Sequence, residues 1–291
     1  MICSLFLRPP LTINGKTVLY GIIGHPVRHS MSPAMHNAAF AAMAMNGVYV
    51  PMDVEDVDIA VAGLKELGFI GVSVTVPHKE TVMACLDEID PVAEKIGAVN
   101  TLLFQNNPDD DRVIVHGFNT DWLGSNLALA EKMQLEGSRV LVIGAGGAAK
   151  AVGFGLVEVG AQVIITNRTE EKGRELAEWV GCNFVCSDQL EVVHADALVN
   201  TTSVGMEPDV DAIPVDPALL ARFSIVMDIV YAPLETRLLR EAAAVGCQVI
   251  DGLAMLQYQG AVQFKIWTGK QPPQEVMRKA LLDELVGRKT N

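Results

Sequence analysis

The stretch VLVIGAGGAA, residues 140–149, decides the fold of this chain. An apolar run typical of a buried strand is followed by Gly144, Gly146 and Ala149 in the pattern G-x-G-x-x-A. Gly144 permits a tight turn, Gly146 lets backbone N–H groups approach a pyrophosphate, and Ala149 allows close packing of a helix on the strand. Because the pattern follows a strand and opens a helix, it predicts a dinucleotide site. The alternative is a glycine turn that serves packing alone.

The next expected strand, QVIIT, ends at NRTEEK, residues 167–172. NAD-selective sites usually present an acidic residue here to the ribose 2′-hydroxyl. In its place the chain has an amide, a guanidinium, a hydroxyl and, one turn on, an ammonium group: Asn167, Arg168, Thr169 and Lys172. These groups suit a 2′-phosphate and favour NADP over NAD. Glu170 and Glu171 oppose this interpretation, although acidic residues are also common at a helix start.

Strand-like and helix-like segments alternate along the whole chain. Residues 18–24, 48–54 and 71–76 predict strands, with helices over 32–47 and 57–67 between them; Ser32 is the expected cap of the first helix and Gly47 its stop. After the glycine turn, further strands are expected at 197–200, 225–229 and 248–250, followed by helices from Gly252 and after Pro272-Pro273. This order predicts an α/β fold with largely parallel sheets.

Two domains are expected from the length of 291 residues. We assign residues 1–120 together with 256–291 to an α/β substrate-binding catalytic domain. We assign residues 121–255 to a Rossmann-type dinucleotide-binding domain.

Composition narrows the classes of function. The net charge of −13 argues against nucleic-acid binding, which relies on basic surface. The five scattered cysteines argue against a disulfide framework or a zinc site, and favour a reducing cytoplasm. The N-terminal MICSLFLRPP is a poor signal peptide, and no apolar stretch is long enough to span a bilayer. A soluble cytoplasmic protein without a bound metal is therefore expected, and a homodimer is one assembly that the residues leave open.

One lysine stands just past the end of an expected strand. In GVSVTVPHKE, residues 71–80, Pro77 ends the alternating run because proline cannot donate to a sheet ladder. Lys79 is therefore delivered to the carboxyl edge of the sheet, where α/β proteins bind ligands. The alternative is an ordinary solvated lysine.

Two hydroxyls lie at another strand-to-helix turn, in GHPVRHSMSPAMHN, residues 24–37. Ser30 and Ser32 beside a helix start could cradle a carboxylate. Ordinary helix capping is the alternative. The three histidines His25, His29 and His36 would not share a face at this spacing, so we expect no metal here.

Nine short motifs run in one order along nearly the whole chain: HSMSP (29–33), SVTVPHK (73–79), GAVNT (97–101), GFNTDWLG (117–124), GAGGAA (144–149), NRT (167–169), NTTSVGM (200–206), DIVYAPLETRLL (228–239) and MLQYQG (255–260). By these motifs the chain resembles the shikimate/quinate dehydrogenase family. The resemblance implies reversible oxidation of a ring hydroxyl of shikimate to 3-dehydroshikimate with hydride going to NADP, a step of aromatic amino acid and chorismate biosynthesis. It also implies an active site in a cleft between two α/β domains, with the C-terminal helices returning to the substrate domain.

The resemblance also implies a role for individual residues. Ser30 and Ser32 would hold the substrate carboxylate, and Lys79 with Asp121 would form the catalytic pair, the aspartate orienting an ammonium that gives a proton to the carbonyl. The other substrate-binding residues implied are Thr75, Asn100, Tyr231 and Gln259. The cofactor-binding residues implied are Gly144, Ala145, Gly146, Gly147 and Ala148 for the pyrophosphate, Asn167, Arg168, Thr169 and Lys172 for the adenosine phosphate, and Ile229 and Gly252 near the nicotinamide.

The chain departs from the family pattern at Ser73 and His25, where asparagine is frequent. A serine reaches less far than an amide, which puts direct contact between Ser73 and the substrate in doubt and leaves the preference between shikimate and quinate open. A quinate/shikimate dehydrogenase that uses NAD is therefore an alternative. A non-catalytic ligand sensor is another, against which Lys79 and Asp121 argue.

Overall fold

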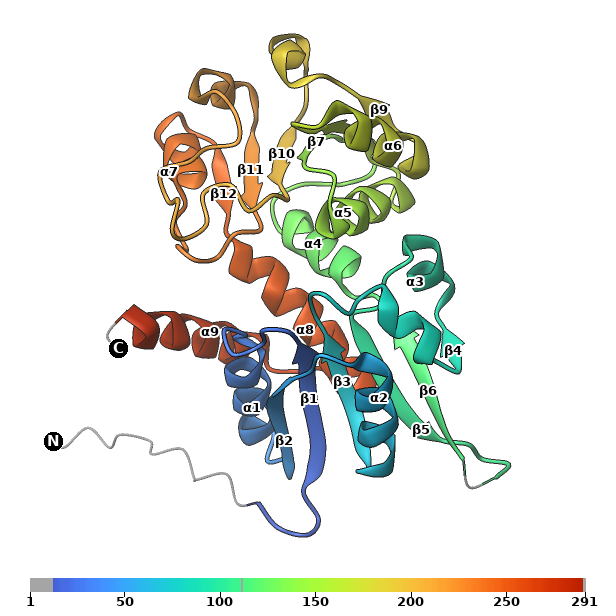
Figure 1. Cartoon of the computed structure of the whole chain (residues 1–291). Coiled ribbons are helices and arrows are strands. Elements are labelled where there is room, and N and C mark those ends of the chain that lie inside the picture. The colour runs from blue at the N-terminus through green and yellow to red at the C-terminus, as the bar shows by residue number, and fades with distance from the viewer. Residues whose placement is uncertain (1–12, 111, 290–291) are drawn as a thin grey trace, which may run out of the picture. The chain divides into compact units, whose positions relative to one another are not determined.

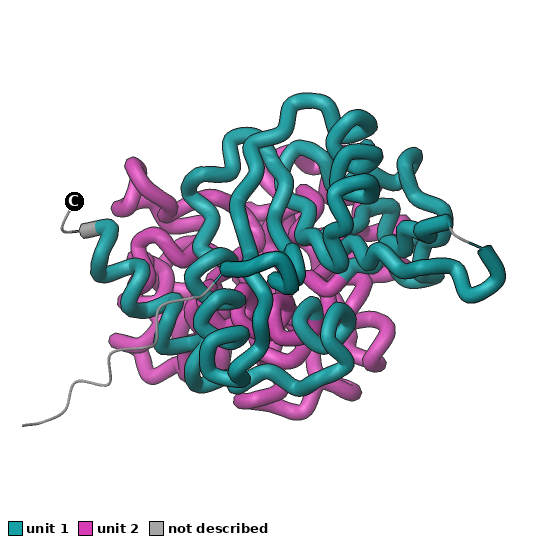
Figure 2. The backbone as a smooth tube through the Cα atoms, turned by 90° about the horizontal axis from the view of Figure 1, so that it is seen from below, with its two compact units in different colours: residues 1–119, 263–291 teal, residues 120–262 magenta. Residues whose placement is uncertain are grey.

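The computed structural model describes residues 13–110 and 112–289. The chain divides into two compact units, residues 1–119 with 263–291 and residues 120–262 (Figure 2). The long helix α8 (Gly252–Thr268) runs from the second unit into the first. The division therefore falls inside this helix, at 262/263, whereas the sequence analysis placed it at 255/256.

Unit 1 is built on a six-stranded sheet in the order β2-β1-β3-β5-β6-β4. Its strands are β1 (Val18–Gly24), β2 (Gly47–Asp53), β3 (Phe69–Val74), β4 (Glu88–Ile89), β5 (Thr101–Asn106) and β6 (Val113–Phe118). β1 runs parallel to β2 and β3, while β5 is antiparallel to both β3 and β6. Its helices are α1 (Ser32–Ala42), α2 (Val57–Glu66), α3 (Pro91–Ile96) and α9 (Gln274–Lys289), with α9 beside α1 (Figure 1).

Unit 2 has a six-stranded sheet in the order β12-β11-β10-β7-β8-β9, and every strand pair in it is parallel. Its strands are β7 (Arg139–Ile143), β8 (Gln162–Thr166), β9 (Asn183–Phe184), β10 (Ala197–Asn200), β11 (Ile225–Asp228) and β12 (Gln248–Ile250). Its helices, besides most of α8, are α4 (Asp121–Ala130), α5 (Gly147–Glu158), α6 (Glu170–Val180) and α7 (Arg237–Ala244).

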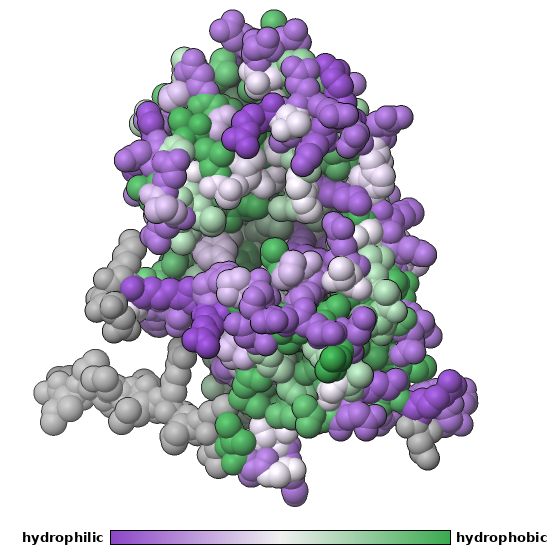
Figure 3. Space-filling view, in the orientation of Figure 1, coloured by the Kyte–Doolittle hydropathy of each residue, from purple (hydrophilic) through white to green (hydrophobic). Residues whose placement is uncertain are grey.

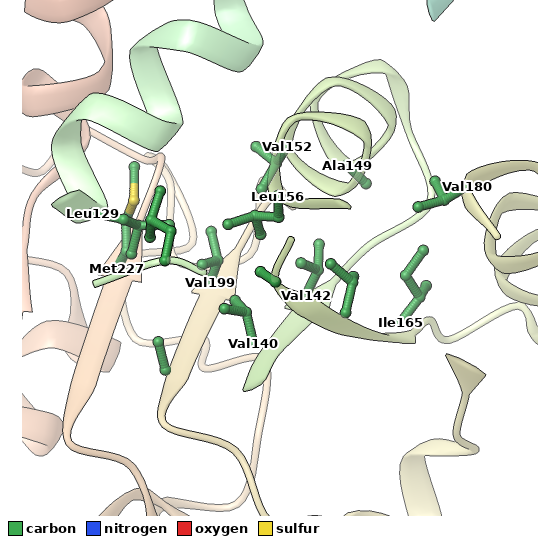
Figure 4. Packing of buried hydrophobic residues seen from close by; sticks show 14 of the residues in the cluster. Leu129, Val140, Val142, Ala149, Val152, Leu156, Ile165, Val180, Val199 and Met227 are labelled. Carbon is green, nitrogen blue, oxygen red and sulfur yellow. The ribbon is translucent and has the colours of Figure 1, made fainter. Parts of the chain in front are cut away.

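The core of unit 2 fixes the glycine turn in place. Val140 and Val142 on β7 face Ala149, Val152 and Leu156 on α5, and all five side chains are fully buried (Figure 4). A strand and a helix packed this closely leave the turn between them little freedom to move.

The predicted α/β class with parallel sheets and a Rossmann-type unit is confirmed. Both predicted ends of the first helix are wrong. The first helix ends at Ala42, before Gly47, because the chain turns at Ala44 with a left-handed φ of 52° and then enters β2. Its cap residue is Met31, and Ser32 is already the first helical residue.

The strand that precedes Lys79 also differs from the expected one. β3 begins at Phe69, two residues earlier than predicted, and ends at Val74, so that Val76 and Pro77 lie in the following turn. Nearly all of β3 is buried on both faces, and Val76 is 68% exposed. The alternation of valines therefore does not mark a half-buried strand.

On the face shown in Figure 3, hydrophilic and hydrophobic residues are interspersed over the surface. Within the part of the chain that the structure describes, no helix combines the length and the apolar character needed to cross a membrane. Four cysteines are described, Cys85, Cys182, Cys186 and Cys247, and all are free thiols. Cys3 and the N-terminal segment MICSLFLRPP lie outside the described residues.

A buried histidine lies in an aromatic cluster of unit 1. The ring of His36 on α1 stacks on Tyr49 at 4.5 Å and contacts Trp267 at 5.2 Å and Phe264 at 6.4 Å between centroids. Burial lowers the pKa of His36 from 6.5 to about 3, and neither ring nitrogen has a hydrogen-bond partner among the described residues. Tyr49 is the titratable neighbour in this cluster, and burial raises its pKa, so it is neutral wherever the histidine would titrate.

We expect His36 to make the protein acid-sensitive. Between pH 6.5 and about 3 the unfolded chain binds a proton at this site that the folded chain does not, so the free energy of unfolding falls as the pH is lowered. The largest slope from one such group is about 1.4 kcal/mol per pH unit. Urea unfolding of His36→Met between pH 7 and 4.5 should show a shallower decline than the wild type. His194→Met, which removes an exposed histidine, should leave the slope unchanged, and equal slopes in all three proteins would contradict the assignment.

Candidate active-site residues in the two units

The serine loop, which we define as residues 25–31, joins β1 to α1 in unit 1. Ser30 is half-buried and its Oγ accepts a hydrogen bond from the N–H of Ser32 at 3.3 Å. Ser32 is 4% exposed, and the cap residue of α1 is Met31, which makes no side-chain cap bond. The capping interpretation of Ser32 is therefore wrong, and its hydroxyl instead opposes the rise that burial causes in the pKa of Tyr49.

The turn after β3 is held by contacts that do not involve the side chain of Lys79. The His78 ring bonds the carbonyl of Val54 at 2.6 Å, and the N–H of Val99 donates to the carbonyl of Lys79 at 2.7 Å. The N–H of Thr75 donates to the carbonyl of Ile23 at 2.9 Å, so Thr75 lies at the carboxyl ends of β1 and β3. The structure thus places half-buried Thr75 and Lys79 at one edge of the sheet, on a firmly attached turn.

A buried chain of hydrogen bonds runs behind these residues. The Tyr49 hydroxyl donates to Ser73 Oγ at 2.7 Å, which donates to Gln263 Oε1 at 2.9 Å. Gln263 Nε2 donates to Thr101 Oγ1 at 2.9 Å, which donates to Asn100 Oδ1 at 2.7 Å. Thr101 thereby fixes the amide of Asn100 with its Oδ1 toward Thr101, so that its donor atom Nδ2 lies on the other side of the amide.

This chain of hydrogen bonds also explains the unusual Ser73. Its hydroxyl is engaged by Tyr49 on one side and Gln263 on the other, and the residue is 4% exposed. Ser73 therefore links β2 to α8 by side-chain hydrogen bonds from β3. Tyr49 and Gln263 had no signal in the sequence, because a buried tyrosine in a strand and a glutamine in a helix look like ordinary core and surface residues.

Asp121 is the first residue of α4, in unit 2. The preceding residue, Thr120, donates from Oγ1 to Gln259 Oε1 at 3.4 Å, and Gln259 Nε2 donates to the carbonyl of Leu256 at 3.0 Å. The structure therefore brings Gln259 of α8 next to the start of α4. Lys79 belongs to unit 1 and Asp121 to unit 2, so their pairing stays a prediction.

The glycine turn between β7 and α5 has the geometry of a phosphate site. Gly144 has φ of 123°, where a Cβ would also lie 2.6 Å from Thr201 Oγ1, so only glycine fits. At Gly146 and Gly147 a Cβ would meet nothing within 4 Å, so the backbone at the helix start lies open. α5 has no acidic residue in its first turn. An open helix N-terminus without a carboxylate favours an anion.

The end of β8 carries no acidic residue. Asn167 Nδ2 donates to the carbonyl of Thr169 at 2.8 Å and so closes the turn into α6. Arg168 and Lys172 are exposed on this turn and its first helical residues. Glu170 is paired with Arg174 at 3.2 Å, one turn further along α6. Of the two acids in the first turn of α6, Glu170 therefore has part of its charge offset by an arginine, and Glu171 is not a member of this pair.

A buried carboxylate fixes the loop after β11. Asp228 is fully buried and accepts hydrogen bonds from Thr236 Oγ1 at 2.7 Å, Asn200 Nδ2 at 2.9 Å and the N–H of Val230 at 3.1 Å. Burial raises the pKa of Asp228, and these three bonds oppose the shift. Asn200, Asp228 and Thr236 lie in the motifs NTTSVGM and DIVYAPLETRLL. Membership in these motifs was the one sequence feature that could have indicated their positioning role.

The same loop brings Ile229 and Gly252 together. A Cβ on Gly252 would lie 2.4 Å from the carbonyl oxygen of Ile229, so the start of α8 can approach this loop only with glycine there. Tyr231 follows in the same loop, half-buried. The two residues assigned to the nicotinamide thus form one backbone contact at the carboxyl edge of the unit 2 sheet. Across the described residues, no group of three histidine, cysteine or acidic side chains could hold a metal ion.

A parallel sheet, an open glycine turn and a strand end without an acid define unit 2 as that of an NADP-dependent oxidoreductase. Family comparison agrees: residues 22–102 match the shikimate dehydrogenase substrate binding domain, residues 126–210 the shikimate/quinate 5-dehydrogenase family, and residues 252–282 the shikimate 5′-dehydrogenase C-terminal domain.

Individual relatives are similar over almost the whole chain. A shikimate dehydrogenase (NADP⁺) of Methanocaldococcus jannaschii is 44% identical, with 94% of this chain and 99% of the relative aligned. A crystal structure of a shikimate dehydrogenase with NADP⁺ has a TM-score of 0.87 at 43% identity, covering 94% of this chain and 98% of that one. The Thermus thermophilus enzyme with NADP(H) and shikimate has a TM-score of 0.81 at 41% identity, covering 92% and 99%. The chain belongs to the shikimate dehydrogenase family, which confirms the resemblance inferred from its motifs.

Proposed function

We propose that the protein catalyses the reversible, NADP-dependent oxidation of shikimate to 3-dehydroshikimate. The observation that carries this proposal is the open glycine turn followed by a strand end with Arg168 and no acid. The serine loop and the turn bearing Lys79 supply the substrate side, in the unit that matches the substrate binding domain of the family.

Two residues are assigned to proton transfer. In the oxidation direction the neutral amine of Lys79 takes the hydroxyl proton as the C–H bond breaks. In the reduction direction its ammonium returns that proton to the carbonyl oxygen and stabilises the charge that develops there. Asp121 orients the ammonium. NADP, when bound, accepts or gives the hydride.

The remaining residues bind and orient. Ser30 and Ser32 donate to the substrate carboxylate, and Thr75 lies on the same edge of the sheet as Lys79. The Nδ2 end of Asn100, oriented by Thr101, serves a ring hydroxyl. Gln259 and Tyr231 of unit 2 complete the substrate contacts.

The cofactor contacts follow the edge of the unit 2 sheet. The backbone of Gly144, Ala145, Gly146, Gly147 and Ala148 receives the pyrophosphate. The turn over residues 167–169, together with Lys172, receives the 2′-phosphate. Ile229 and Gly252, in contact with each other, form the surface for the nicotinamide.

The second candidate is a quinate/shikimate dehydrogenase that uses NAD, and Ser73 keeps it open, because its hydroxyl is engaged by Tyr49 and Gln263 and offers no amide to the substrate. Turnover of purified protein with shikimate and quinate, each with NADP and NAD, tests both candidates. The proposal requires shikimate with NADP to be the most efficient of the four pairs.

Arg168 should set the cofactor preference. We expect the wild type to prefer NADP over NAD by at least about tenfold in kcat/KM, because a permanent guanidinium pairs with a 2′-phosphate and the end of β8 itself carries no acid. Arg168→Ala should lower kcat/KM for NADP by about tenfold and leave that for NAD nearly unchanged. Arg139→Ala, at the opposite end of β7, is the matched control. An equal loss with both cofactors would contradict a role in recognising the phosphate.

The cytoplasm is the compartment we propose, since the four described cysteines are free thiols, as in reducing compartments. A homodimer stays a prediction, to be tested by sedimentation of the purified protein.

A further inference from the structure

The C-terminal helix α9 reaches the serine loop through one arginine. Arg288 Nη1 donates to the carbonyl of His29 at 2.8 Å, and Nη2 donates to the carbonyl of Ser30 at 3.1 Å. Its Nε donates to Glu284 at 3.1 Å, one turn back on the same helix. The planar guanidinium thus spans two consecutive carbonyls of the loop while a carboxylate holds it from behind, a geometry that lysine cannot reproduce.

These two bonds hold the half of the loop that carries Ser30. The first half has its own attachments: the N–H of His25 donates to the carbonyl of Val76 at 3.0 Å, and the His25 ring bonds Asp53 at 2.7 Å. In the second half the N–H of Ser30 donates to the carbonyl of Val27 at 2.9 Å, which is a contact within the loop itself. Besides the buried side chain of Met31, Arg288 ties this half to another element.

The arginine is carried by a well-anchored helix. Met277 and Leu281 of α9 are fully buried, and α9 packs along α1, the helix that Ser32 begins (Figure 1). A rigid support of this kind preserves the geometry of a binding group better than a loop does. Both serines are therefore positioned against elements that pack on each other.

The positive charge of Arg288 is a second contribution, besides its hydrogen bonds to the loop. The chain has a net charge of −13, and the proposed substrate is an anion. The guanidinium of Arg288 is a permanent positive charge bonded to the backbone of Ser30, and its side chain is only 35% exposed. Glu284 offsets part of this charge at 3.1 Å, so we expect the positional effect to exceed the electrostatic one.

We propose that Arg288 is a positioning residue for the substrate carboxylate: it holds the backbone of His29 and Ser30 so that the hydroxyl of Ser30 is ordered before the substrate binds. Ordering a loop in advance lowers the entropic cost of binding, so its loss weakens binding of the carboxylate. This inference rests on the proposed function of the serine loop.

The test is steady-state kinetics and calorimetry on Arg288→Met and Arg288→Lys. Arg288→Met should raise KM and Kd for shikimate by about tenfold, the usual worth of a charge-assisted hydrogen bond, with KM for NADP unchanged and kcat reduced less than KM is raised. Arg288→Lys should recover only part of the loss, since a single ammonium cannot span both carbonyls.

Two matched variants separate positioning from general effects. Arg237→Met removes an arginine with the same pattern of contacts in unit 2, a bond to a carbonyl at 2.8 Å and an i,i+4 partner at 3.5 Å. Lys279→Met removes a charge and an i,i+4 pair from α9 itself. Both should keep the wild-type KM for shikimate.

The possible outcomes are distinct. A wild type that does not turn over shikimate refutes the proposed function. An active wild type with unchanged shikimate KM and Kd in Arg288→Met refutes the positioning role alone. A lower melting temperature with unchanged shikimate binding would make Arg288 a purely structural residue, and full recovery in Arg288→Lys would assign the effect to charge.

Discussion

Replacing Lys79 with alanine should lower kcat by roughly 10²–10⁴, the usual worth of a positioned acid–base group. We expect this side chain to take or give the proton that must accompany hydride transfer, and water in its place is a far weaker donor. The measurement is turnover in both directions at saturating shikimate and NADP, with the melting temperature as a check on folding. Lys95→Ala, an exposed lysine on α3, is the control and should keep wild-type turnover.

The fold should tolerate the change at Lys79 because the turn is held by its backbone. The carbonyl of Lys79 still accepts from Val99, and the neighbouring His78 still bonds the carbonyl of Val54. Added methylamine should restore part of the activity if the missing group is an amine. Near-normal kcat in a folded Lys79→Ala protein would remove the catalytic assignment, and Asp121→Asn should show a smaller loss if Asp121 only orients the lysine.

Local patterns were sufficient for the cofactor unit. The role of a glycine turn is determined by the strand before it and the helix after it. The run from β7 through α5 to β8 could therefore be predicted from residues 138–169 alone. The same is true of β10 and β12, whose bounds are those predicted, because each is a short apolar run between polar turns.

The substrate unit was harder to predict. The antiparallel pair β5 and β6 was not predicted, although QNNPDDDR, residues 105–112, is a turn signal between two apolar runs. The boundaries of α1 and β3 were wrong because a left-handed Ala44 and burial on both faces of β3 are tertiary effects.

Long-range contacts account for what the sequence could not indicate about the site. Ser73 and Gln263 are 190 residues apart, and Arg288 and Ser30 are 258 apart, yet both pairs are hydrogen-bonded. No local pattern distinguishes these polar residues from solvated ones. The motifs predict the groups that would touch a substrate, whereas the residues that orient those groups become visible only once the chain is folded.

The double variant Ser30→Ala with Ser32→Ala should weaken shikimate binding by about 10²–10⁴-fold. Each hydroxyl is expected to donate one hydrogen bond to the carboxylate, and losing a bond to a charged group costs about 1.5–3 kcal/mol, less where water substitutes. NADP binding serves as the internal control, because the glycine turn and residues 167–172 lie in unit 2. Calorimetric titration of each ligand into the folded variant gives both values.

The free energy of unfolding should change little in this variant, so a loss of shikimate binding could not be attributed to unfolding. Ser32 does not cap α1, the bond that Ser30 Oγ accepts at the helix start is long at 3.3 Å, and Tyr49 still donates to Ser73 at 2.7 Å. The two single serine variants separate these contributions. If Arg288 orders the backbone of Ser30, then Ser30→Ala should weaken shikimate binding much less in the Arg288→Met background than in the wild type. Ser32→Ala should weaken binding by the same factor in both backgrounds. Normal shikimate binding by the double variant would place the carboxylate elsewhere in the protein. Equal coupling of both serines to Arg288 would mean that the arginine acts through its charge. A charge acts on both hydroxyls, whereas the two backbone bonds hold the backbone of Ser30 and not that of Ser32.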